Sequence, residues 1–309
     1  MPSTATSPSA VPSLTPSETS PYGYVPTRGV CIAFVVLFGF SALLHLVTAI
    51  RFRLWWLVPT ACLMGAGEVI GWVGRLWSSM NVMEHTPFTM QIVCTILAPT
   101  PLLAAIFIIF TRMTQILGVR YSRLTPRWYT AVFLTCDIVA LVIQGLGGGI
   151  AADAKTISTT NLGANVMLAG IVFQLVAMLA FSTLAAEYFY RFAKDRPIRG
   201  KDTSTANRDS VATAVNAPRP WDKRHKLMAL GLTISTTFLI IRGIYRTIEL
   251  GDGWNGKVLR TEVYFTVFDA AMVAVSTYSL NLLNPGVLLY SRHSVRDSEE
   301  DYQLGKMSP

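Results

Sequence analysis

The chain alternates long apolar segments with short polar ones. Seven apolar segments can be marked, and each approaches or exceeds the roughly 20 residues with which a helix spans a hydrocarbon core of about 30 Å. The segments run from Gly29 to Ile50, Leu54 to Gly74, Thr89 to Phe110, Trp128 to Ile150, Asn165 to Tyr188, Leu227 to Ile248 and Glu262 to Leu289. The pattern predicts an all-α polytopic membrane protein with seven transmembrane helices.

Composition points to the same fold class. The 309 residues are 51% hydrophobic and only 14% charged, and the mean hydropathy is +0.43. Soluble domains carry roughly 25% charged residues, so this composition excludes a soluble globule.

The remaining segments define the domain organisation. Residues 1–28 are rich in Ser, Thr and Pro and contain no apolar core of a signal peptide, so we expect a disordered extracellular tail. Residues 29–289 form the predicted seven-helix transmembrane domain, which includes a basic cytoplasmic loop at 189–226. Residues 290–309 form a predicted cytoplasmic tail.

The positions of the basic residues predict how the chain is oriented. Of the 26 Lys and Arg residues, 19 fall in the loops and tail on one side of the predicted bundle. Cytoplasmic loops carry such an excess, so we expect the N-terminus outside and the C-terminus in the cytoplasm. The net charge of +8 is mostly this bias, and it gives no reason to expect a nucleic-acid partner.

Metal and cofactor chemistry finds little support in the sequence. The four cysteines lie inside apolar segments without paired spacing, and the four histidines are dispersed. We therefore expect packing cysteines, no metal site and no other cofactor. The sequence contains no complete nucleotide-binding motif, and we do not expect an enzyme.

Polar and ionisable side chains inside the predicted spans are the informative exceptions. A lone charge at bilayer depth costs at least ~2.5–3.5 kcal/mol on insertion scales, so such groups should face the bundle interior and be paired or hydrated. At 1.5 Å per residue, their levels coincide in the half of the bundle predicted to face outside. The candidate ligand-binding cavity consists of Glu68, Arg75, Asp137, Gln144, Gln174, Arg242, Tyr245, Arg246, Glu249, Glu262 and Asp269.

Two interpretations of this set remain open. One is a group of structural ion pairs that orient the helices. The other is a hydrated cavity that opens outward and binds a polar or charged head group. Arg242 is the deepest arginine, and its expected partner is Asp269 or Glu68. Arg246 and Glu249 are expected nearer the outer rim.

Two further motifs concern the backbone. The stretch Ala98-Pro-Thr-Pro101 predicts a kink near the middle of the third span, which would either free backbone carbonyls to line a cavity or only bend the helix. The glycines of Gly145-Leu-Gly-Gly-Gly149 predict either a close helix contact or a turn at the end of a helix.

Together these residues resemble the fungal lipid-translocating exporter family, also called the aminocholesterol-resistance family. The stretch from Glu68 to Arg75 is similar to the ExxGYxxR element of that family, with Trp72 in place of the Tyr. The other matching motifs are Leu97-Ala-Pro99, Asp137 with Gln144 and Gly147 to Gly149, Gly170 with Gln174, and the run Arg242 to Glu249 followed by Glu262 and Asp269.

The resemblance implies seven spans and a role in tolerance of toxic amphiphiles. We expect a protein that binds and translocates amphiphilic lipids, such as sphingoid bases, phospholipids or sterol analogues, or toxic drugs. The alternative is a receptor-like lipid or stress sensor without transport. The expected partner is a membrane lipid or amphiphilic small molecule. The expected location is the plasma membrane, with the vacuole or endoplasmic reticulum as alternatives, and the sequence gives no oligomeric state.

Overall fold

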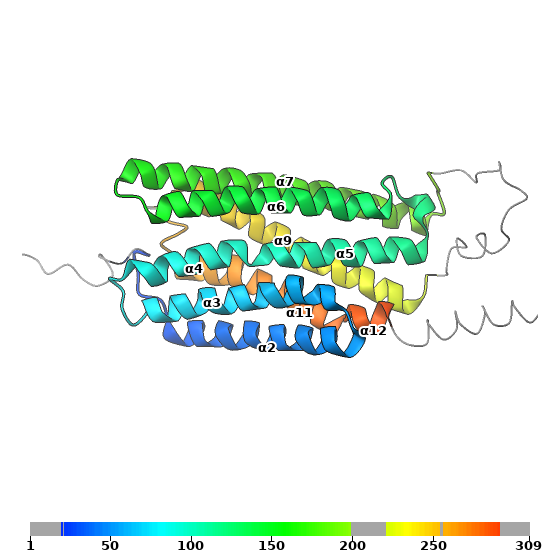
Figure 1. Cartoon of the computed structure of the whole chain (residues 1–309), viewed down its shortest axis with the longest axis horizontal. Helices are drawn as coiled ribbons and strands as arrows, with labels where there is room; N and C mark the ends of the chain where they lie inside the picture. Colours follow the sequence, from blue (N-terminus) through cyan, green and yellow to red (C-terminus); the bar gives the residue numbers. More distant parts are fainter. Residues whose placement is uncertain (1–19, 21, 199–220, 254–255, 291–309) are drawn as a thin grey trace, which may run out of the picture.

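The structure is an elongated helical bundle (Figure 1). It is a computed structural model that describes residues 20, 22–198, 221–253 and 256–290. In the described part of the chain, 7 helices are long and apolar enough to cross a membrane, which confirms the seven-span prediction. They run Arg28–Phe52, Trp55–Ser78, His85–Leu117, Pro126–Ala152, Ile157–Ala193, Lys223–Gly251 and Glu262–Leu289.

Several of these spans contain more than one element. The elements are α2 (Arg28–Phe52), η1 (Trp55–Leu57), η2 (Val58–Cys62), α3 (Leu63–Ser78), α4 (His85–Leu97), α5 (Pro99–Leu117), η3 (Val119–Tyr121), α6 (Pro126–Ala152), α7 (Ile157–Ala193), α9 (Lys223–Gly251), α10 (Glu262–Phe265), η4 (Thr266–Ala271), α11 (Met272–Leu282) and α12 (Pro285–Leu289).

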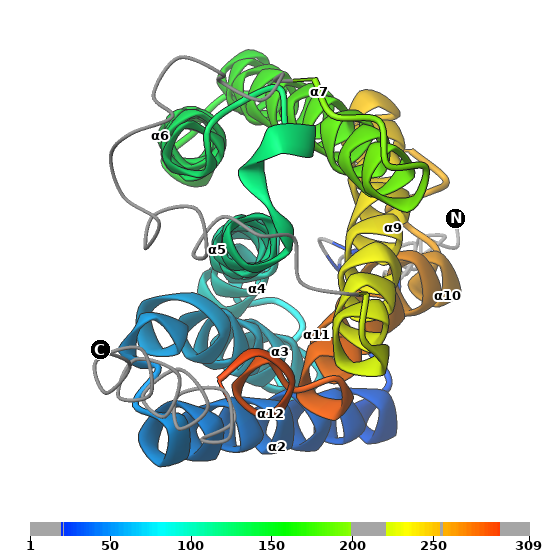
Figure 2. The same cartoon turned by 90° about the vertical axis from the view of Figure 1, so that its right-hand side faces the viewer.

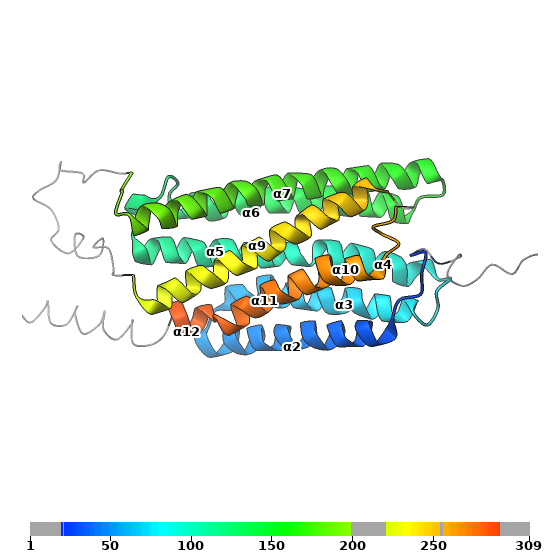
Figure 3. The ribbon, with the colours of Figure 1, turned by 180° about the vertical axis from the view of Figure 1, so that it is seen from behind.

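The described chain enters and leaves the bundle at opposite ends. Helix α2 begins at one end, and α12 lies at the other (Figures 1 and 3). We call the first the N-terminal end; it also carries the α3–α4, α6–α7 and α9–α10 connections. Helix α9 crosses the bundle obliquely from α12 towards the far end, and along its course it contacts α11, α5 and α7. It therefore brings its polar face against several other spans.

The third span is broken as its prolines predict. Helix α4 ends at Leu97 and α5 begins at Pro99, because a proline inside a helix removes a backbone hydrogen bond and clashes with the preceding turn. The seventh span is also irregular, since η4 is a stretch of π-helix between α10 and α11. Both irregular segments are close to the charged residues described below.

The glycines of α6 make a close helix contact rather than a turn, because α6 continues to Ala152. A Cβ added at Gly147 would lie 2.5 Å from the Met167 backbone nitrogen and 2.7 Å from the Gly163 carbonyl oxygen of α7. The flanking Gly145 and Gly149 have nothing within 4 Å of such a Cβ. Gly147 thus lets the backbones of α6 and α7 touch.

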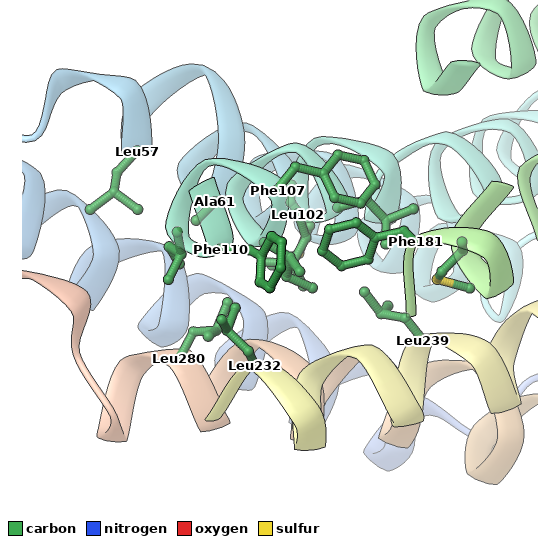
Figure 4. Packing of buried hydrophobic residues seen from close by; sticks show 14 of the residues in the cluster. Leu57, Ala61, Leu102, Phe107, Phe110, Phe181, Leu232, Leu239 and Leu280 are labelled. Atoms are coloured by element: carbon green, nitrogen blue, oxygen red, sulfur yellow. The ribbon is translucent and has the colours of Figure 1, made fainter. Parts of the chain in front are cut away.

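A cluster of aromatic side chains packs between α5 and α7. Phe107 and Phe110 of α5 pack edge-on against Phe181 of α7, with ring centroids 4.6 and 5.3 Å away (Figure 4). Helix α5 lies near the middle when the bundle is viewed along its axis, with the other spans around it (Figure 2).

The predicted tails and the basic loop are only partly described. Residues 1–19 and 21, residues 199–220 of the basic loop, and residues 291–309 of the C-terminal tail lie outside the described part. Tyr22, within the predicted disordered tail, is only 3% exposed and packs edge-on against Phe88 of α4. The apolar surface of these rings explains why residues 22–27 are ordered on the bundle.

Candidate functional site

Arg246 is the centre of a buried ion cluster, which we define as Arg242, Arg246, Glu249 and Asp269. Its guanidinium donates from Nε and Nη2 to the two carboxylate oxygens of Asp269, both at 2.7 Å. Its Nη1 donates to Glu249 Oε2 at 2.7 Å. Paired, two-bond contacts of this kind are the strong form of the arginine–carboxylate interaction. They join α9 to η4 inside the bundle.

Arg242 joins the same cluster one turn away along α9. Its Nε lies 3.0 Å from Asp269 Oδ1, so the ion pair expected from the sequence is present. Its Nη2 donates to the Thr95 carbonyl oxygen at 2.6 Å. In an unbroken helix that carbonyl would accept from the amide of residue 99, but Pro99 has no N–H. The proline break therefore supplies the acceptor that Arg242 uses.

Thr95 and Tyr245 complete the hydrogen bonding of the cluster. The Thr95 hydroxyl accepts from Arg246 Nη2 at 3.0 Å, so one residue of α4 contacts both arginines. Tyr245 donates its hydroxyl to Glu249 Oε1 at 3.0 Å. Thr95 is not among the residues predicted for the site, although its position four residues before Pro99 marks a carbonyl without its usual partner.

Arg246 makes more buried hydrogen bonds than Arg242. Arg246 is 2% exposed and Arg242 is 8% exposed, and Arg246 lies one helical turn closer to the N-terminal end of the bundle. Asp269 binds both arginines because both point from α9 to the π-helical segment η4. π-Helical turns inside α-helices often occur at functional sites.

Glu68 lies beside the ion cluster without joining it. The side chain is 0% exposed, and neither carboxylate oxygen has a hydrogen-bond partner among the described residues. Asp269, Arg242 and Arg246 all act on it electrostatically. The alternative pairing of Arg242 with Glu68 is therefore not formed.

A second group lies at the N-terminal end around Arg75, which is 1% exposed. Arg75 Nη2 donates to the Tyr24 hydroxyl oxygen at 2.6 Å and lies 3.4 Å from Glu262 Oε1. The Phe265 ring lies under the guanidinium, 4.5 Å from its centroid. Glu262 also accepts from the backbone nitrogen and hydroxyl of Thr27, at 2.8 and 2.7 Å. These contacts fasten the segment before α2 onto α3 and α10.

Burial affects the tyrosines of this segment. It raises the pKa of Tyr22 to about 12 despite the opposing effects of Ser78 and Arg75. It also raises the pKa of Tyr24, against the opposing charge and hydrogen bond of Arg75. Both phenols are therefore neutral at physiological pH and act as hydrogen-bonding groups rather than as counter-ions.

A third group lies between α5, α6 and α7. Gln144 Nε2 donates to Gln174 Oε1 at 2.9 Å, and Gln174 Nε2 donates to the Thr100 hydroxyl at 3.0 Å. Asp137 is 2% exposed and interacts with the Gln174 side chain, but its Oδ2 has no partner among the described residues. The structure thus divides the predicted residues into three groups rather than one.

Two pockets lie on the two sides of the ion cluster. The first, the end pocket, encloses about 550 Å³ of empty space with its mouth included. Its residues are Tyr22, Tyr24, Arg75, Phe88, Gln91, Ile92, Ile96, Ala164, Met167, Arg246, Glu249, Leu250, Gly253, Leu259 and Phe265. The second, the central pocket, encloses about 380 Å³ and is lined by Arg242, Gln144, Gln174 and Thr100, among others. Ile96 lines both pockets.

The described residues hold no evident metal centre. Within them, no group of three or more His, Cys, Asp or Glu side chains is arranged to hold a metal ion. All four cysteines are free. The polar chemistry of the site is therefore that of guanidinium, carboxylate, amide and hydroxyl groups.

Comparison with known proteins identifies relatives over most of the chain. The model of a family described as "RTA1 like protein" matches residues 61–292. The sphingoid long-chain base transporter RSB1 of Saccharomyces cerevisiae is 29% identical over 287 residues, which cover 87% of this chain and 74% of the relative.

Two other relatives come from the same yeast. Protein RTM1 is 27% identical over 210 residues, which cover 68% of this chain and 60% of the relative. Protoporphyrin uptake protein 1 is 27% identical over 212 residues, which cover 68% of this chain and 62% of the relative. No solved structure matches the chain. The names of these relatives point to membrane transport of lipid-like compounds rather than to enzymes.

Proposed function

The chain belongs to the RTA1-like protein family, and we propose that it binds an amphiphile by its charged head group in the end pocket and translocates it across the plasma membrane. The proposed substrate class includes sphingoid bases, phospholipids, sterol analogues and toxic drugs, so that transport gives resistance. The relative named as a sphingoid long-chain base transporter makes sphingoid bases the first substrates to test.

The observation that carries this proposal is the contrast between the walls and the polar lining of the end pocket. Phe88, Ile92 and Met167 present apolar surface, whereas Arg246 and Glu249 present charges of both signs. Ligand sites usually combine a mostly apolar lining with a few placed polar groups. An amphiphile fits such a lining because its head group meets the charges and its chain meets the apolar wall.

The proposed orientation gives the pocket its direction of access. With the N-terminus outside, as the distribution of basic residues indicates, the N-terminal end of the bundle faces the cell exterior. The end pocket then opens outward, and the ion cluster separates it from the central pocket. We propose that a head group passes between the two pockets, which requires the contacts of Arg242 or Arg246 to rearrange.

Reconstitution in liposomes tests this function directly. The full chain is reconstituted with a fluorescent sphingoid base or a fluorescent phospholipid, and the movement of each probe between leaflets is measured. Ala164→Phe fills the end pocket without changing a charged residue. Ala180→Phe is the matched control, because Ala180 lies on the same helix with an exposed side chain.

We expect movement of at least one probe by the wild type and the control, and at least about tenfold slower movement by Ala164→Phe, a barrier increase of about 1.4 kcal/mol. Wild-type rates in Ala164→Phe would show that the end pocket is not the route. Binding of a probe without movement would instead favour the receptor-like sensor.

A further inference from the structure

The ionisable groups around the ion cluster are unequal in number. Two arginines, Arg242 and Arg246, lie among three carboxyl groups, those of Asp269, Glu249 and Glu68. Asp269 is held by both arginines and Glu249 by Arg246. The arginines and their two partners are therefore neutral together, and Glu68 is the remaining acid.

The surroundings of Glu68 do not compensate a negative charge. Its carboxyl group is fully buried, no partner of its oxygens among the described residues meets hydrogen-bonding geometry, and the donor that acts on it is the neutral Trp72 indole N–H. The charged and titratable groups that act on it are Asp269 of η4, Arg242 and Arg246 of α9, and the Cys94 thiol of α4. Because both arginines are already bound to other carboxylates, an ionised Glu68 would be a buried charge without a partner, which is strongly unfavourable. Glu68 is therefore neutral, which means that its carboxyl group is protonated.

Glu68 shares one face of α3 with Arg75, a residue of the end pocket. Glu68, Trp72 and Arg75 are four and three residues apart, so they lie on one face of α3. The Trp72 indole N–H acts on the Glu68 carboxyl group, and Arg75 Nε has no hydrogen-bond partner among the described residues. Arg75 lines the end pocket. Glu68 is therefore buried on the same face of α3 as a residue that lines the end pocket.

We propose that Glu68 is a proton site that exchanges its proton for a cationic head group bound in the end pocket. When an ammonium group enters beside Glu249, it adds one positive charge near the cluster. The Glu68 O–H bond then breaks, its electron pair stays on the carboxylate, and the proton passes to water. One cation enters and one proton leaves, so the charge of the region is unchanged. An anionic head group cannot drive this exchange.

This inference rests on the proposed function and narrows its substrate class to amphiphiles with a positively charged head group. The exchange also couples transport to protons, because protons that move down their own gradient can drive the movement of the cation. A chain that binds a cation only when Glu68 loses its proton binds the cation more tightly on the side of higher pH.

Proton release on binding tests the exchange with a probe that has no proton of its own. Dodecyltrimethylammonium is titrated into the full chain in lipid nanodiscs, and calorimetry in two buffers of different ionisation enthalpy counts the protons released. At pH 7 we expect about one proton per bound cation in the wild type. In Glu68→Gln we expect none, with binding weakened at least tenfold.

Three results would overturn the exchange. Binding of the cation by the wild type without proton release would show that Glu68 is already ionised. Release of a full proton by Glu68→Gln would place the proton elsewhere. A wild type that does not bind the cation at all also overturns it, while movement of a phospholipid probe in liposomes would leave the proposed function standing.

A measurement without any ligand separates the two proposals further. Infrared spectroscopy at pH 7 shows the carbonyl band of protonated carboxyl groups, and Glu68→Gln should remove part of that band. Asp137→Asn is the matched control, because Asp137 is a second buried carboxyl group with an unpartnered oxygen. An unchanged band in Glu68→Gln would show an ionised Glu68 whatever the protein transports.

Discussion

The two arginines of the ion cluster should contribute unequally to stability. Arg246 makes two bonds to Asp269, one to Glu249 and one to Thr95. Arg242 makes one hydrogen bond, to Thr95, and one further ion contact with Asp269. Substitution by Met keeps most of the side-chain volume and removes the charge, so it isolates these interactions.

The magnitudes follow from what each substitution leaves behind. Arg246→Met leaves Glu249 with only the Tyr245 hydroxyl and Asp269 with only Arg242. Removing one member of a buried ion pair costs about 3–5 kcal/mol, and we expect a loss in this range. Arg242→Met leaves Asp269 fully bonded to Arg246, so its cost should be that of one charged hydrogen bond, about 1.5–3 kcal/mol.

Unfolding of the purified protein in mixed micelles measures both losses, and a double-mutant cycle with Asp269→Leu measures the coupling. Arg246→Met with Asp269→Leu should cost clearly less than the sum of the two single changes. Arg123→Met is the control, because the Arg123–Glu187 pair is exposed and should contribute at most about 1 kcal/mol. A loss in Arg242→Met as large as that in Arg246→Met, or additive losses in the cycle, would refute the reasoning.

Four further outcomes are expected. In a Pro99→Ala background, Arg242→Met should cost about 1 kcal/mol less than in the wild type, because the new amide competes for the carbonyl that Arg242 uses; a second double-mutant cycle measures this. Gly147→Ala should destabilise by about 1–3 kcal/mol, since its Cβ meets backbone of α7, whereas Gly149→Ala should be neutral in the same unfolding assay. Tyr24→Phe removes an acceptor from a buried guanidinium and should cost about 1.5–3 kcal/mol in thermal unfolding; an unchanged midpoint would contradict this. On intact spheroplasts, a tag at the N-terminus should be labelled and one at the C-terminus should not; the reverse pattern would invert the proposed orientation.

The sequence predicts the spans and the depth of their polar residues, because both depend only on position along a helix. Apolar length identifies all seven helices, and the rise per residue places Arg242 and Asp269 at compatible levels. The lateral arrangement of helices is not contained in that arithmetic. The packing of the helices against one another decides that Gln144 pairs with Gln174. It also decides that Glu68 lies beside the arginines without an ion pair to them. These outcomes depend on packing between distant segments.

The break in the third span has a mechanical consequence. Thr95 lies just before the break at Ala98, and its two oxygen atoms bind two arginines of the sixth span that both grip Asp269 of the seventh. On the other side of Ala98, Phe107 and Phe110 of α5 pack against Phe181 of α7. Ala98 keeps helical backbone angles, φ −56° and ψ −40°, so α4 follows α5 without a loop between them and is coupled to two other spans through Thr95. A movement of α4 relative to α5 would therefore have to carry the sixth and seventh spans with it or break their contacts with Thr95.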